Sequence, residues 1–219
     1  MEETIMDKSV YSLVLMDDVV AEVDRLAYRM NTSRSNMINQ ILAEYVSYMT
    51  PEKRMREVFD RAINMLTGSG TFQLMLQPSD STMSLRSALA YKYNPTVRYS
   101  VELYRDQQGA AGELKVLLRS QNNSLILYMN QFFKLWTRLE QAYVGDTNYK
   151  IESGRYTRVL RLPEKIKSNE QMGEILAEYI KVLDECMKIF FELLDQPQAA
   201  AARIENRYRK YLAGGNAIC

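Results

Sequence analysis

The feature that most constrains the fold is one alternating segment near the beginning of the chain, residues 8–15, which read KSVYSLVL. Alternation of apolar and other side chains over such a length predicts a β-strand. One face of this strand would hold Tyr11, Leu13 and Leu15, and the other would hold Val10, Ser12 and Val14. The rest of the first fifty residues has helical spacing, so the N-terminal part combines a single strand with helices.

Two helices and a capped corner are predicted after this strand. Residues 19–30, VVAEVDRLAYRM, carry apolar side chains at helical spacing. Asn31 stands where a left-handed residue ends a helix, and Ser33 can cap the N-terminus of the next one. A third helix is predicted from Pro51 to Leu66, because proline suits the first turn of a helix.

The remaining residues predict a second, mixed region. TGSG at 67–70 is the best candidate boundary, and beyond it the pattern changes to strands, hairpins and long helices. The predicted elements are a strand at 71–77, hairpins at 96–120 and 149–162, and helices at 122–145, 168–194 and 197–215. The chain is therefore predicted to be an α+β protein, with a module at 1–50, a connecting helix and Gly/Ser linker at 51–70, and an α+β domain at 71–219.

The composition excludes several function classes. The chain has no histidine, and no phosphate-binding GxxxxGK[ST] loop or GxGxxG element, so we do not expect an enzyme. Two cysteines, Cys186 and Cys219, lack metal-ligand spacing, and we expect no metal and no cofactor. The acidic N-terminus lacks the apolar stretch of a signal peptide, and no apolar run approaches roughly 18 residues. These features predict a cytoplasmic protein that does not interact with membranes.

The stretch from Lys8 to Val46 resembles the ribbon-helix-helix family of DNA-binding domains, of the MetJ, Arc and CopG type. The resemblance covers residues 8–49 and rests on three marks in register: the alternating strand, the corner LAYRMNTSRSNMI, and the heptad-like spacing after it. It implies an intertwined homodimer, in which the strands of two protomers pair as an antiparallel ribbon. The dimer core would then contain Tyr11, Leu13, Leu15, Ile38 and Ile41.

The resemblance also implies contacts with double-stranded DNA. A two-stranded ribbon fits the major groove, and the outward strand residues Val10, Ser12 and Val14 would face the base edges. The N-terminus of the second helix would contact a phosphate through Ser33, Arg34 and Ser35, where free backbone N–H groups meet the positive end of the helix dipole. The implied function is a transcriptional regulator of the repressor type, with a partner- or effector-binding C-terminal domain.

Charge and side-chain chemistry keep a second interpretation open. Residues 1–50 contain four basic and eight acidic side chains, a net charge of −4, and two of the three reading positions are valine. Phosphate neutralisation dominates DNA affinity, so an acidic module opposes it. In the alternative, the N-terminal module only dimerises, and the C-terminal domain of this accessory protein binds a protein or RNA partner.

A basic segment at 150–167 is a candidate for an auxiliary nucleic-acid surface. It has a net charge of +4, and the surface would use Lys150, Arg155, Arg158 and Arg161. The same charges are also typical of a solvated hairpin edge that resists aggregation. Both interpretations predict that all four side chains are exposed.

Overall fold

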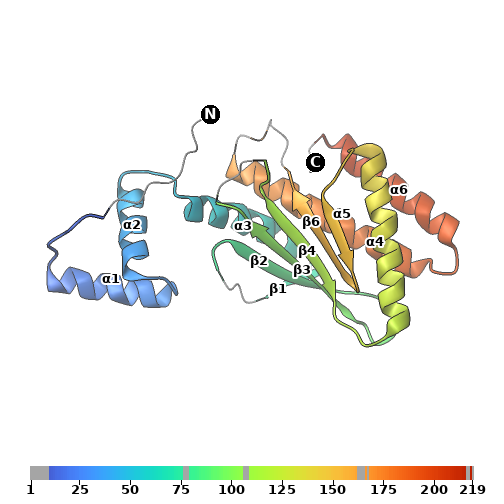
Figure 1. The fold of residues 1–219 in the computed structure, drawn as a ribbon, viewed down its shortest axis with the longest axis horizontal. Coiled ribbons are helices and arrows are strands. Elements are labelled where there is room, and N and C mark those ends of the chain that lie inside the picture. Colours follow the sequence, from blue (N-terminus) through green and yellow to red (C-terminus); the bar gives the residue numbers. More distant parts are fainter. Residues whose placement is uncertain are drawn as a thin grey trace. The chain divides into compact units, whose positions relative to one another are not determined.

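The structure is a computed structural model of the chain and describes residues 10–75, 79–105, 109–161, 166, 168–215 and 218. Six helices and six strands lie in this part of the chain (Figure 1). The helices are α1 (Asp17–Arg29), α2 (Arg34–Tyr45), α3 (Pro51–Thr67), α4 (Asn123–Tyr143), α5 (Asn169–Glu192) and α6 (Pro197–Ala213). The strands are β1 (Phe72–Leu74), β2 (Thr82–Ala88), β3 (Thr96–Leu103), β4 (Gly112–Leu118), β5 (Tyr149–Glu152) and β6 (Arg155–Leu160). The protein is therefore of the mixed α+β class, as predicted.

The chain divides into two compact units between Thr50 and Pro51. The first contains α1 and α2, and the second contains α3 to α6 with all six strands. Helix α3 was predicted as a connecting segment at 51–70, yet its apolar side Met55, Val58, Phe59, Ala62 and Leu66 is buried in the core of the second unit. Burial of this stripe makes α3 a structural part of that unit.

In the first unit, helices α1 and α2 pack around a small core of Val23, Ala27 and Met37. The strand predicted for residues 8–15 is not formed within the single chain. Residues 10–16 have no regular secondary structure, and residues 8 and 9 lie outside the described part. A strand requires a partner for its backbone N–H and C=O groups, and all the described strands belong to the second unit.

The second unit is built on one antiparallel sheet with the order β1-β2-β3-β4-β6-β5. The predicted hairpins appear as β3–β4 and β5–β6, and Gly154 adopts a φ of 68° at the second turn. The prediction missed β2, whose residues TMSLRSA pair with β1 on one side and with β3 on the other. Without β2, residues 71–77 had no predicted neighbour in the sheet.

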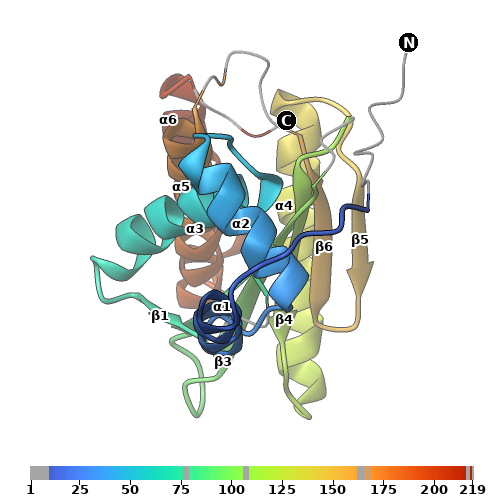
Figure 2. The same cartoon turned by 90° about the vertical axis from the view of Figure 1, so that its left-hand side faces the viewer.

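Helices cover one face of this sheet (Figures 1 and 2). Strand side chains of that face, such as Leu85, Tyr99 and Val116, are fully buried against α3, α4 and α5, and α6 packs on α5. A chain of aromatic contacts links these layers, including Phe133 stacked on Tyr156 with ring centroids 5.2 Å apart. Among the described residues, no helix of the second unit covers the opposite face of the sheet.

Candidate functional site

The corner between α1 and α2 forms as the sequence predicts. Asn31 has a left-handed φ of 50°, and the backbone N–H of Thr32 donates to the carbonyl of Ala27 at 2.9 Å. This pattern is the Schellman termination of a helix. Ser33 then caps α2, since its hydroxyl oxygen accepts from the backbone N–H of Asn36 at 3.3 Å. The cap fixes where α2 begins, and the side chains of Ser33, Arg34 and Ser35 at this end are exposed.

The first turn of α2 has the free backbone donors of a helix N-terminus. No hydrogen bond from the backbone N–H of Arg34 or Ser35 is found among the described residues, as the start of a helix leaves these donors free. Helix N-termini attract phosphate because the free donors lie at the positive end of the helix dipole. The predicted contact set Ser33, Arg34 and Ser35 is thus together on one exposed turn.

Arg34, however, already has a partner. Its Nε donates to Oδ1 of Asp24 at 2.6 Å, and a second nitrogen donates to Oδ2, in a two-pronged pair between α2 and α1. The Arg34 hydrogen bond holds the pKa of the Asp24 carboxyl below its usual value, and the Asp24 hydrogen bond raises the pKa of Arg34. A phosphate would compete with this carboxylate for the guanidinium.

The residues predicted to read bases and to form a dimer core are exposed in the single chain. Leu13 is 61% exposed and Leu15 is 41% exposed, while Val10 and Val14 on the other face of the predicted strand are almost fully exposed. Ile41 is also exposed, and Ile38 is half-buried against the small core of the first unit. One chain alone does not bring the predicted dimer core together.

The prediction of one basic surface on the β5–β6 hairpin is wrong for Arg158. Arg158 is completely buried beneath the helices, whereas Lys150, Arg155 and Arg161 are exposed. Side chains in a strand alternate between faces, so two residues three positions apart, such as Arg155 and Arg158, point to opposite sides of the sheet. In addition, Lys150 and Arg155 both form ion pairs with Glu152.

Arg158 instead belongs to a buried polar cluster with Glu140 on α4. Its Nε lies 3.2 Å from Oε2 of Glu140, close enough for an ion pair but without the alignment of a hydrogen bond. Tyr156 and Tyr179 donate to the two carboxylate oxygens at 3.0 Å and 2.8 Å. Burial raises the pKa of Glu140, and the charge of Arg158 and the tyrosine hydrogen bonds oppose this shift. Arg158, Glu140, Tyr156 and Tyr179 are all fully buried, so we interpret this cluster as structural.

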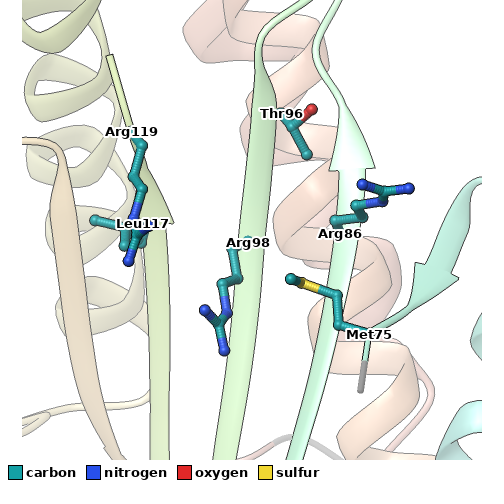
Figure 3. A pocket seen from close by; sticks show the side chains of 6 residues that line it. All are labelled: Met75, Arg86, Thr96, Arg98, Leu117 and Arg119. Atoms are coloured by element: carbon teal, nitrogen blue, oxygen red, sulfur yellow. The ribbon is translucent and has the colours of Figure 1, made fainter. Parts of the chain in front are cut away.

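The open face of the sheet contains a second basic site that sequence reasoning missed. Its cavity of about 340 Å³ is lined by three arginines together with Met75, Thr96 and Leu117 (Figure 3). Arg86 comes from β2, Arg98 from β3, and Arg119 from the residue directly after β4. Register brings them together, because Arg86 pairs with Arg98, and Arg98 pairs with Leu117. The sequence signal for this site is an arginine at an outward-facing position of each alternating segment. This signal can be used only when β2 is recognised as a strand.

Comparison with known proteins gives no identification, since no protein-family model, curated protein or solved structure matches this chain. Within the described residues, no helix is long and apolar enough to cross a membrane, and no three His, Cys, Asp or Glu residues are grouped to hold a metal ion. The candidate sites are therefore the α2 corner and the arginine site of the sheet.

Proposed function

We propose that the chain is a homodimeric ribbon-helix-helix DNA-binding protein, a transcriptional regulator of the repressor type whose second unit binds an effector or partner. The observation that carries this proposal is a mismatch in the first unit: it has a small core and leaves many large apolar side chains exposed. Most of the exposed large apolar side chains of the described residues precede Thr50, although that part is under a quarter of the chain.

A partner strand would resolve this mismatch. Burying a large apolar side chain contributes roughly 1.5–3 kcal/mol, so covering Tyr11, Leu13 and Leu15 in two protomers favours association. An antiparallel ribbon would also pair the backbone groups of residues 10–15, which have no strand partner in the single chain. Ile38 and Ile41 on α2 would extend the shared core.

DNA binding would follow from the dimer. Val10, Ser12 and Val14 would line the outer face of the ribbon in the major groove, where valine contacts thymine methyl groups and serine bonds to base edges. The free N–H groups of Arg34 and Ser35 would hold a backbone phosphate on each side. In this interaction Arg34 exchanges the Asp24 carboxylate for the phosphate.

A second candidate function is a dimeric accessory protein in which the first unit only joins protomers and the second unit binds a protein or RNA partner. The ion pair between Asp24 and Arg34 favours this accessory function, because Asp24 neutralises Arg34, the cation at the free N–H groups of α2. The net charge of −4 over residues 1–50 acts in the same direction.

One pair of variants separates these functions. Asp24→Asn frees Arg34, whereas Glu22→Gln removes the same charge from α1 but frees Arg25, its partner at 2.9 Å. We expect Asp24→Asn to bind genomic DNA fragments more tightly than Glu22→Gln does. We also expect Asp24→Asn to steepen the slope of log K against log salt by about one, and Glu22→Gln to change this slope less. Equal effects of the two variants would contradict a phosphate contact by Arg34.

A loss-of-function arm tests the reading face. The double variant Ser12→Ala with Arg34→Ala removes a predicted base contact and the phosphate cation while leaving the predicted dimer core intact. We expect a dimer that has lost sequence-selective DNA binding in a salt series. Absence of any DNA binding by the wild-type dimer at low salt would overturn the proposal and support the accessory function.

A further inference from the structure

Within the described part of the chain, the three arginines of the open sheet face have no carboxylate partner, whereas Lys115 on the same face has one. Lys115 on the same face lies 2.7 Å from a carboxylate oxygen of Glu113, and Arg105 lies 3.1 Å from one of Glu52. Among the described residues, Arg86, Arg98 and Arg119 form no ion pair; Arg86 donates to Gln73 at 2.9 Å and Arg98 to Ser84 at 3.3 Å. Their combined charge is therefore not neutralised within the described part of the protein.

The arrangement of these arginines opposes folding. Arg86 and Arg98 are direct neighbours across antiparallel strands, where like charges destabilise the pair. Their guanidinium groups point away from one another, with Arg98 between Arg119 on one side and Arg86 on the other (Figure 3). Nε of Arg98 is inaccessible to solvent and has no hydrogen-bond acceptor among the described residues. An anion in the cavity would supply acceptors and remove the repulsion once these side chains turn toward it.

We propose that this site binds a small molecule that carries a diphosphate group. Arg86 and Arg98 lie on neighbouring strands, whose backbones are about 4.8 Å apart, and Arg119 directly follows the next strand. Three guanidinium groups so placed suit two linked phosphates more closely than one. The volume of about 340 Å³ lies at the small end of the range for ligand pockets. Met75 and Leu117 add apolar surface for the rest of the molecule, and Thr96 adds a hydroxyl.

The same surface is poorly suited to single-stranded nucleic acid. Binding of that kind uses aromatic side chains on which bases stack, and none of the described residues that line this cavity is aromatic. Glu102 and Glu113 also face outward, as direct neighbours across β3 and β4. A longer phosphate backbone along the sheet would meet these carboxylates, whereas a small ligand need not reach them.

The inference concerns the second unit and does not depend on DNA binding by the first. Titration calorimetry on the 219-residue chain, without DNA and at fixed ionic strength, is the appropriate measurement. The probes are inorganic pyrophosphate, ADP, inorganic phosphate, citrate and a short single-stranded RNA. We expect pyrophosphate and ADP to bind, and phosphate, citrate and RNA to bind at least about tenfold more weakly, because each lost charge-assisted bond costs about a factor of ten or more.

Two variants provide the residue-level test. Arg98→Gln should weaken pyrophosphate binding roughly tenfold or more, while Arg138→Gln, an exposed position on α4, should leave it unchanged. Without ligand, Arg98→Gln should keep or raise the melting temperature, because it removes a like-charge pair; pyrophosphate should then no longer raise it. A purely structural arginine would lower the melting temperature instead.

Several results would overturn the proposal. Equal affinity for citrate and pyrophosphate would show a general anion patch, and tighter binding of RNA than of ADP would assign the surface to nucleic acid. Binding of pyrophosphate that survives both Arg98→Gln and Arg86→Gln would place the ligand elsewhere. None of these outcomes bears on the Asp24→Asn experiment, so failure of this site and failure of DNA binding are distinguishable.

Discussion

The two units of this protein differ in how far they bury their apolar side chains. The second unit encloses a continuous core in which Phe132, Phe133 and Trp136 have no exposed surface. The first has a core of three residues, while Leu13 and Tyr45 remain exposed. The chain has a net charge of +1, so the −4 of residues 1–50 leaves +5 for residues 51–219.

This difference suggests that the units have different requirements for stability. A unit with a continuous core can fold by itself, whereas a module with its apolar face in water requires another surface. We therefore expect unfolding of the second unit to be independent of protein concentration and that of the first to depend on it. The single tryptophan, Trp136, lies in the second unit and reports on that unit alone.

The largest effect expected in the second unit comes from its buried ion pair. Glu140→Ala leaves Arg158 charged in the interior, and removing one partner of such a pair costs about 3–5 kcal/mol. Urea unfolding followed by Trp136 fluorescence measures this loss. The helical signal of the first unit should not change.

A double replacement provides the control. Glu140→Leu with Arg158→Leu removes both charges, and we expect it to cost much less than Glu140→Ala. A loss below about 1 kcal/mol for Glu140→Ala would show that water reaches this cluster.

A smaller effect tests whether α3 belongs to the second unit. At Gly173 on α5, an added Cβ would lie 2.6 Å from the carbonyl oxygen of Val58 on α3. Gly173→Ala should therefore force the helices apart and cost about 1–3 kcal/mol in the Trp136 transition. Gly214→Ala, where the closest atom is 3.2 Å away, should cost less. If Gly173→Ala leaves the transition unchanged, α3 does not pack on α5 as described.

The thiol of Cys186 reports on the tightness of the same core. Burial raises the pKa of Cys186 to about 12, and the thiolate is the reactive form. In a Cys219→Ser background, we expect reaction with a thiol reagent at pH 8 to be at least about a hundredfold slower than in urea. Rapid reaction of the folded protein would show frequent opening of the α5–α6 layer.

The smallest effect concerns the exposed pair in the first unit. The Arg34 hydrogen bond lowers the pKa of Asp24 in the folded protein, so this pair stabilises the corner above the ordinary aspartate pKa of 3.8. The contribution is lost as the pH falls through the lowered value. NMR titration of the Asp24 carboxyl should show a pKa below 3.8 that returns toward it in Arg34→Gln. An unchanged pKa would mean that the pair does not persist in solution.

The sequence predicted elements whose signals are local. These signals are a helix end at Asn31, helix starts at Ser33, Pro51 and Pro197, and a hairpin turn at Gly154. Each of these residues lies where it was expected. β2 was missed because the alternation of Met83 and Leu85 is interrupted by Ser87, which also faces inward.

The sites depend on longer-range information. Arg158 was assigned to the surface although period-two alternation separates it from Arg155, and its partner Glu140 lies on a helix that no local pattern connects to β6. Arg86, Arg98 and Arg119 meet only through the order and register of three strands. The corner at Asn31 and Ser33 was predicted, but its Asp24–Arg34 pair depends on how α1 and α2 pack.

The most direct test of the contrast between the units is the mass of the 219-residue chain in solution, measured for the wild type, Leu13→Asp and Val14→Asp. These neighbours lie on opposite faces of the predicted strand, and the substitutions introduce the same charge. We expect the wild type and Val14→Asp to sediment as dimers and Leu13→Asp as a monomer, with the Trp136 transition unchanged in all three. A monomeric wild type, or equal masses for the two variants, would contradict an intermolecular ribbon.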